Sequence, residues 1–423
     1  MGKPKKYVKI NGIMKLNPEW KKWKEQQGGG APATTVQRPS LALPIVSSME
    51  DHEKLNEAAM ASGGKEIALA ESTSATIEMM QEPEICVDAG MDPDTVVDEL
   101  GALLNKYEVP IGLMNKLMML SEYEVMEFMI DDSGSMTLNT DSKDSQGRIQ
   151  TRWTEAQVRL KEMIEVLAYV PFNQIVIVFL NRTDVISFQR NGRDPKTIIA
   201  DAYQKIDGVF SKSPSGTTPA LEKIQKSLAG NPGMSIARWF FGDGVPNGGI
   251  NAQREITRLL VQRPNPSQNP MTFISCTNED DQVEWMKDAE EAAPYCSESD
   301  DFRDEAAEVM RDQGAALPYS KGFHLVGTLV GAMNPDDLDA MDESIPFTKA
   351  TLDNLLGIQH NEESYRHYFN LFMEAQGNRR VESPSDNLKK STRWNYNDFL
   401  QAPMASQIAA VQDFKGKLKT MGG

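Results

Sequence analysis

Cysteine is scarce in this chain: three residues in 423, an odd number, with no CxxC pair among them. They are Cys86, Cys276 and Cys296. Such a set fits reduced thiols inside a cell better than the disulfide framework of a secreted protein. The four histidines show no ligand spacing such as HExxH, so the sequence gives no sign of a histidine zinc site.

Long apolar runs are also missing. The longest, Phe323 to Met333, is too short to span a bilayer, which predicts no transmembrane segment. The basic opening, Met1 to Lys6, is not followed by the apolar stretch of a signal peptide. These features together predict a cytoplasmic protein.

Positive charge is in the minority, since the net charge is −17 and the pI is about 4.8. An acidic chain repels phosphates, so nucleic acid is not an expected partner. Eight of the first 24 residues are nevertheless lysine. We interpret this patch as a solvated tail, and the alternative is a strap that docks on an acidic surface.

Several catalytic motifs are absent as well. No Walker A loop, no GxGxxG loop and no GxSxG turn occurs, and no nucleophile with an evident base stands out. The sequence therefore does not predict an enzyme.

What is present is an alternation of apolar strands and amphipathic helices. Strands are expected near 125–130, 174–180, 236–241 and 271–276, with an antiparallel edge strand at 184–189. Helices between successive strands indicate an α/β fold: a doubly wound, mostly parallel sheet with helices on both faces. We expect a basic tail and low-complexity linker over 1–90, a helical pair over 91–121, this domain over 122–335, and a helical extension over 336–423.

Within that extension, an aromatic stripe recurs at helical spacing. It consists of Tyr365, Tyr368, Phe369 and Phe372. The pattern predicts a helix docked on the main domain, and the alternative is a helix that binds a partner. A last helix is expected near 406–417.

Three polar segments come at expected strand ends or helix starts. Asp131-Asp132-Ser133-Gly134-Ser135 follows the first strand, residues 215–219 (SGTTP) open a helix, and Gly242-Asp243-Gly244 closes another strand. In a parallel sheet these places meet at the carboxyl edge. Hydroxyl and carboxylate oxygens are the ligands that Mg²⁺ prefers, so we expect a metal site there. Asp132 either adds negative charge to that site or faces solvent.

This set resembles the metal-ion-dependent adhesion site of von Willebrand factor A (vWA) domains, which integrin inserted domains share. The resemblance covers roughly residues 122–335. It implies that Ser133, Ser135 and a threonine contact Mg²⁺ (or Ca²⁺ or Mn²⁺), while Asp131 and Asp243 act directly or through water. A Gly-x-Thr-Pro alignment selects Thr218, which we favour, and a plain Gly-Thr alignment selects Thr217.

The resemblance also implies a function. An open coordination position on the metal would attract a carboxylate, so we expect a metal-dependent module that binds a protein presenting Asp or Glu. One alternative is an accessory subunit of an AAA+ ATPase or metal-chelatase machine. Another is a structural or assembly protein that self-associates through its extended flanks.

Overall fold

The computed structural model describes most of the chain after residue 92. The described residues are 7–10, 13–16, 93–144, 146–230, 233–277, 279–333, 338, 341, 344–378 and 394–404. The first two ranges form strands β1 (Tyr7–Ile10) and β2 (Ile13–Leu16), which pair in a small sheet of their own that the sequence analysis did not predict. The expected linker and the last expected helix lie outside the described residues.

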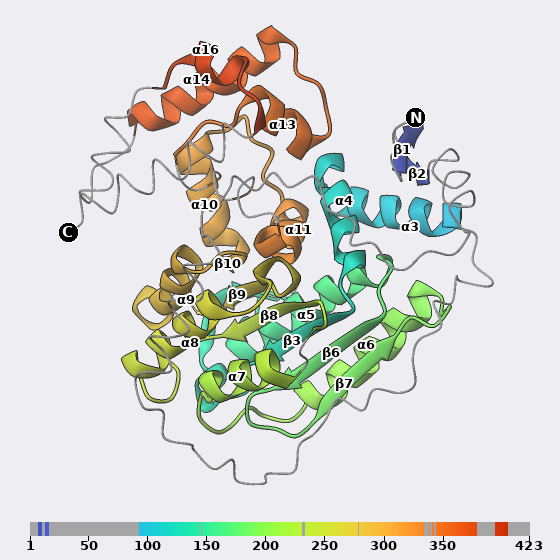
Figure 1. Cartoon of the computed structure of the whole chain (residues 1–423), viewed down its shortest axis with the longest axis vertical. Helices are drawn as coiled ribbons and strands as arrows, with labels where there is room; N and C mark the ends of the chain where they lie inside the picture. Colours follow the sequence, from blue (N-terminus) through green and yellow to red (C-terminus); the bar gives the residue numbers. More distant parts are fainter. Residues whose placement is uncertain are drawn as a thin grey trace, which may run out of the picture. The chain divides into compact units, whose positions relative to one another are not determined.

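A six-stranded, mostly parallel sheet forms the centre of the fold (Figure 1), which confirms the predicted α/β class. Its order is β10-β9-β8-β3-β6-β7, and only β7 runs antiparallel. The strands are β3 (Val125–Ile130), β6 (Gln174–Phe179), β7 (Val185–Gln189), β8 (Ile236–Gly242), β9 (Met271–Ser275) and β10 (Cys296–Ser299). The antiparallel edge strand is confirmed as β7, whereas β10 was not predicted because its sequence, CSES, is short and polar.

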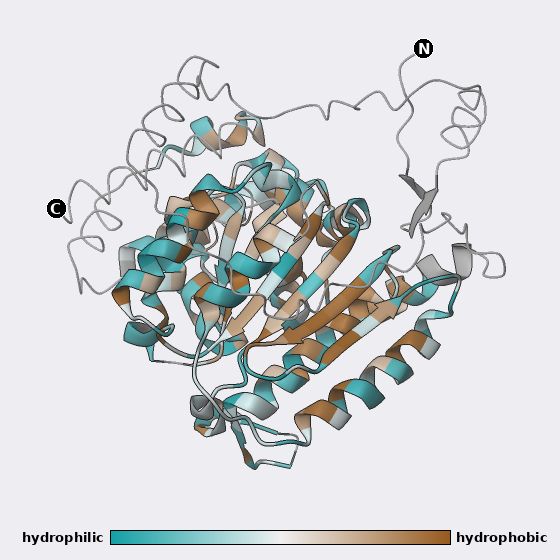
Figure 2. Ribbon diagram, turned by 60° about the horizontal axis from the view of Figure 1, so that its bottom comes forward, coloured by the Kyte–Doolittle hydropathy of each residue, from teal (hydrophilic) through white to brown (hydrophobic). Residues whose placement is uncertain are grey.

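Helices cover both faces of this sheet, as the fold predicted from the sequence requires. Phe128 and Ile130 of β3 belong to one hydrophobic cluster, and the intervening Met129 belongs to another. Side chains of a strand alternate between faces, so the two clusters lie on opposite sides of the sheet. Figure 2 shows the hydrophobic colouring concentrated on the central strands. The arrangement is compatible with a Rossmann-like fold.

The first cluster packs helices α5 (Arg152–Leu167), α6 (Pro195–Phe210) and α11 (Lys321–Val330), and the second packs α7 (Ala220–Gly230), α8 (Ile250–Gln262) and α9 (Asp280–Ala292). Local sequence sets the helix starts. Thr151 and Thr154 form a capping box at α5, and Asp194 caps α6 ahead of a proline at the first helical position. None of the described helices is long and apolar enough to cross a membrane.

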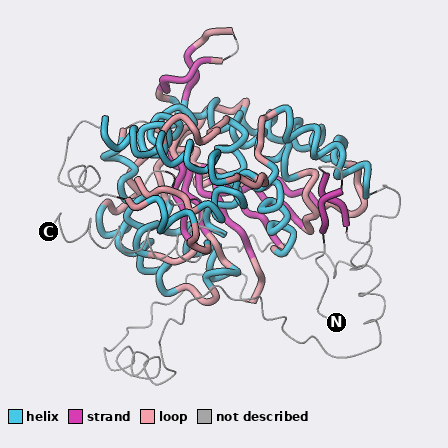
Figure 3. Tube along the Cα trace, turned by 90° about the horizontal axis from the view of Figure 1, so that it is seen from above, coloured by secondary structure: helices cyan, strands magenta, loops and turns pink. Residues whose placement is uncertain are grey.

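A hairpin interrupts the path from β3 to α5. The polar segment there, for which no strand was predicted, forms β4 (Asn139–Lys143) and β5 (Ile149–Thr151), which pair antiparallel. The hairpin stands out from the other described elements (Figure 3). It begins directly after the short turn η2 (Gly134–Thr137), so it is anchored next to the predicted metal loop.

The remaining helices flank the sheet. They are α3 (Pro93–Lys106), α4 (Ile111–Leu117), α10 (Phe302–Gln313), α13 (Lys349–Leu356), α14 (Glu362–Asn378) and α16 (Tyr396–Leu400), with short 3-10 turns η1 (Met118–Glu122), η3 (Pro266–Gln268) and η4 (Gly331–Met333). Helices α3 and α4 lie within residues 91–121. The aromatic stripe of α14 is buried, and the Tyr368 hydroxyl donates to Gln313 of α10 at 2.8 Å. The stripe is therefore a docking face within this chain.

Candidate metal centre

Backbone hydrogen bonds join the three polar loops at the carboxyl edge of the sheet, at the switch point between β3 and β8. The Ser215 N–H donates to the Asp132 carbonyl at 2.8 Å, and the Gly134 N–H donates to the Gly216 carbonyl at 3.2 Å. The third loop is tied to the second because the Asn247 N–H donates to the Thr218 carbonyl at 2.8 Å. Segments far apart in the sequence thus form one connected rim.

Side chains of four predicted site residues meet on this rim. The Ser133 backbone N–H donates to Asp131 Oδ1 at 2.8 Å, and the two serine hydroxyls, Ser133 Oγ and Ser135 Oγ, lie 3.0 Å apart. Ser135 Oγ in turn donates to Asp243 Oδ1 at 2.9 Å. A continuous row of oxygens therefore runs from the first loop to the third, as the strand-end argument predicted.

Asp131 is the residue in this row of oxygens whose negative charge has the fewest partners. Its side chain is fully buried, and Oδ2 accepts no hydrogen bond from the described residues. Burial, and then the negative charge of Asp243, raise the pKa of Asp131 to about 7, although the Ser133 N–H acts in the opposite direction. A buried carboxylate without a counter-charge is costly, and a bound cation would supply that charge.

The two threonines differ in how they are held. Thr217 Oγ1 accepts a hydrogen bond from Asn247 Nδ2 at 2.8 Å, and Thr217 is exposed. Thr218 is half-buried, its N–H donates to Asn247 Oδ1 at 3.1 Å, and its hydroxyl makes no hydrogen bond to any described residue. The Thr218 hydroxyl is thus available to a ligand, while that of Thr217 is engaged within the loop.

Asp132 does not face solvent, so that sequence-based alternative is wrong, whereas its negative charge does act on the site by raising the pKa of Asp131. Its side chain is 1% exposed, and Oδ2 accepts from Arg182 Nε at 2.8 Å. Oδ1 accepts from the Asn181 N–H at 2.7 Å. The two partners follow β6 at its carboxyl end, so they lie at the same edge of the sheet where the sequence predicts the site.

Arg152 is a site residue that the sequence analysis missed. Its Nη1 donates to Asp243 Oδ2 at 3.0 Å, and its Nη2 donates to Glu279 Oε1 at 2.9 Å. Both oxygens of Asp243 are consequently occupied, one by Ser135 and one by this buried guanidinium. No local pattern marks Arg152, because its partners lie 91 and 127 positions away.

Gly216 fixes the threonine loop in a conformation that a side chain would disturb. Its φ is +110°, and a Cβ there would lie 2.5 Å from Asn181 Oδ1. Glycine tolerates this backbone geometry without steric cost. The loop can therefore approach Asn181 closely, and the Asn181 amide also donates to the Thr217 carbonyl at 2.8 Å.

The donor chemistry fits a hard cation with few charged ligands. Two buried carboxylates, two serine hydroxyls and a threonine hydroxyl offer only oxygen, which suits Mg²⁺, Mn²⁺ or Ca²⁺. No cluster of three or more His, Cys, Asp or Glu side chains placed to hold a metal exists in the described part of the chain. The candidate centre has only two such groups, so any metal there would depend on the hydroxyls.

Comparison with known proteins does not assign this chain to a family. No family model matches the sequence, and no curated protein matches it. Among solved structures, the chain is similar to a point mutant of the PilB minor pilin from Streptococcus sanguinis, with 12% identity and a TM-score of 0.33 over 52% of this chain. The match spans 63% of that pilin's chain. A likeness of this size supports no argument about fold or function.

Proposed function

We propose that this chain is a vWA-like module that binds another protein through a divalent cation held at the candidate metal centre. The unpartnered Oδ2 of Asp131, buried beside the row of serine hydroxyls, is the observation that carries the proposal. A fold would not retain such a carboxylate without a counter-charge unless something offset its cost.

Each residue has a distinct role in this proposal. Ser133, Ser135 and Thr218 supply neutral oxygens, and Asp131 and Asp243 supply the negative charge. Arg152 positions Asp243 by occupying its Oδ2, which leaves the other oxygen directed at Ser135. The cation, once bound, supplies a Lewis-acidic centre that attracts an acidic side chain of the partner.

The surface around the centre also suits a protein partner. Leu138, which follows η2, is 51% exposed, and Val245 and Ile250, which follow Asp243, are 38% and 58% exposed. In this proposal the three side chains supply the apolar contacts that accompany the charged one. We therefore expect the partner to present Asp or Glu flanked by apolar side chains.

Two measurements test the proposal. Titration of the full chain with Mn²⁺ by calorimetry should show saturable binding, weakened at least about tenfold by Ser133→Ala. Ser364→Ala, which changes an exposed serine of α14, is the matched control and should bind as wild type. Equal Mn²⁺ affinity in all three proteins would contradict the metal centre.

The partner requires a second experiment. Affinity capture with wild type and Ser133→Ala, in Mg²⁺ and in EDTA, should recover a protein only with wild type in Mg²⁺. An ATPase among the recovered proteins would identify the accessory-subunit role, and this chain alone would identify self-assembly. Recovery of the same proteins from all four samples would refute metal-dependent binding.

A further inference from the structure

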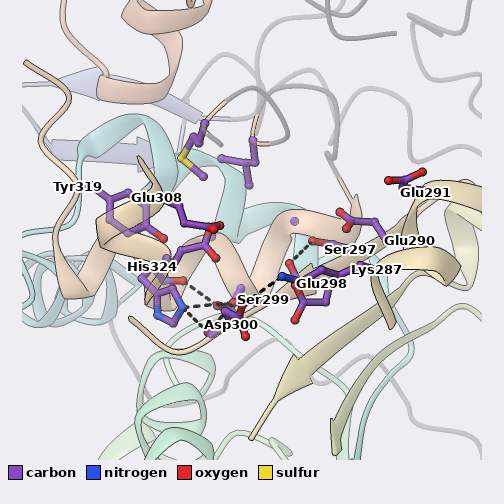
Figure 4. A pocket seen from close by; sticks show the side chains of 16 residues that line it. Lys287, Glu290, Glu291, Ser297, Glu298, Ser299, Asp300, Glu308, Tyr319 and His324 are labelled. Carbon is purple, nitrogen blue, oxygen red and sulfur yellow. Dashed lines mark hydrogen bonds and ion pairs between the residues drawn. The ribbon is translucent and has the colours of Figure 1, made fainter. Parts of the chain in front are cut away.

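A second polar cavity, separate from the candidate metal centre, lies beside β10, the strand at one side of the sheet. It is bounded by α9, the edge strand β10, α10 and α11, and has a volume of about 170 Å³. In Figure 4, Tyr319 and His324 lie at one end of the cavity, and Lys287 and Glu290 lie at the other. None of the residues proposed to bind the metal lines it.

Acidic side chains dominate the lining. Lys287 is the one cation among the lining residues that the structure describes, and its Nζ lies 3.4 Å from Asp300 Oδ2. Burial lowers the pKa of the lining histidine, His324, to about 3, so this ring is neutral at physiological pH. The six carboxylates are Glu290, Glu291, Glu298, Asp300, Glu305 and Glu308.

For two of these carboxylates, the ionised form is unfavourable. Glu298 Oε1 is buried and accepts no hydrogen bond from the described residues. Burial, and then the charge of Asp300, raise the pKa of Glu298 well above its usual range. Burial, and then the charge of Glu308, raise the pKa of Glu305 to about 7. A cationic ligand would offset both burial and repulsion.

Size and chemistry narrow the ligand class. Repulsion excludes anions, and the described residues contain no cluster of His, Cys, Asp or Glu placed to hold a metal ion. Pockets for drug-sized ligands begin at about 300 Å³. This cavity is smaller, so it suits a single charged group rather than a whole nucleotide. Guanidinium and ammonium groups pair with carboxylates, and the Tyr319 ring offers an apolar wall for a cation.

We propose that this cavity binds an alkylguanidinium or alkylammonium group, with Glu298 as its main acceptor. The group belongs either to a small free amine or to an arginine or lysine of another protein. The proposal is independent of the metal centre, because the two sites share no residue.

Calorimetry on the full chain in EDTA tests the proposal with agmatine as the free amine and an acetylated arginine amide as the protein mimic. We expect saturable binding that Glu298→Gln weakens at least about tenfold. Glu284→Gln, which changes an exposed carboxylate of α9 that does not line the cavity, should leave the affinity within about twofold. Tighter binding of agmatine indicates a small-molecule source, and tighter binding of the arginine amide indicates a protein source.

Further controls separate a binding role from a structural one. Thermal unfolding checks that Glu298→Gln is folded, and Glu305→Gln serves as a second variant if it is not. Affinity for agmatine should rise with pH through about 7, because Glu305, whose pKa is raised to about 7, must lose its proton to pair with the cation. Asp131→Ala should bind agmatine as wild type does. No saturable binding of either probe, or wild-type affinity in both glutamine variants, would overturn the proposal.

Discussion

Replacing Asp131 by asparagine should stabilise the metal-free protein while abolishing its response to metal. The pKa of Asp131 is raised from 3.8 to about 7. At about 1.4 kcal/mol per pKa unit, the ionised carboxylate costs the fold on the order of 4 kcal/mol above that pH. Asparagine retains an oxygen to accept from the Ser133 N–H. Its unpaired amide costs about 1–3 kcal/mol, which leaves a net gain of about 1–3 kcal/mol.

The pH dependence of this stability difference follows from the direction in which the pKa of Asp131 is shifted. A carboxyl whose folded pKa is raised costs nothing below the unfolded pKa of 3.8, and the cost grows as pH rises to about 7. The advantage of Asp131→Asn should therefore be largest at about pH 8 and shrink towards about pH 4. Equilibrium urea unfolding in EDTA at several pH values measures this difference.

Metal should reverse the order of stability. A ligand at a thousand times its dissociation constant stabilises the folded state by about 4.1 kcal/mol, which exceeds the advantage of about 1–3 kcal/mol, and Asp131→Asn should gain little of this with Mg²⁺ or Mn²⁺. Asp132→Asn is the contrasting neighbour. It should lose about 3 kcal/mol, because it leaves the Arg182 guanidinium without its buried partner, yet retain the metal response. An Asp131→Asn protein that is less stable than wild type in EDTA, or as responsive to metal, would refute the reasoning.

Three further predictions concern the site and the second cavity. Ser135→Ala should weaken Mn²⁺ binding at least about tenfold in calorimetry, because it removes the hydroxyl that links Ser133 to Asp243. Gly216→Ala should lower the free energy of unfolding in urea by about 1–3 kcal/mol, since its Cβ would meet Asn181 Oδ1. Because the pKa of His324 is lowered to about 3, stability should fall below about pH 6.5 by up to about 1.4 kcal/mol per unit. His324→Gln should reduce that slope, and an unchanged slope would contradict a buried neutral ring.

The periodicity of the sequence was sufficient to predict five of the six strands of the central sheet and most of its helices. Runs such as residues 174–179 (QIVIVF) are apolar along their whole length because parallel strands are buried on both faces. Where the local pattern is weak, prediction failed: β10 is short and polar, and the β4–β5 hairpin has no apolar face. Their strand conformation depends on pairing with a neighbour rather than on propensity.

The candidate metal residues likewise divide into those that the sequence predicts and those that depend on the fold. Strand ends marked Asp131, Ser133, Ser135 and Asp243, because the carboxyl edge of a parallel sheet is fixed by the direction of its strands. Sequence alone left two threonines as alternatives, and the contact of Thr217 with Asn247 forms only in the folded chain.

Long-range charge pairing was decided by tertiary structure alone. The sequence supplied an excess of carboxylates, but their burial and partners depend on segments that meet only after folding. Asp132 lies beside Asp131 in the chain, yet it pairs with Arg182, while Asp131 Oδ2 is left without a partner among the described residues. Adjacent carboxylates thus acquire opposite energetic roles, because the free energy of a buried charge depends on its distance to a counter-charge and to water, neither of which sequence order determines.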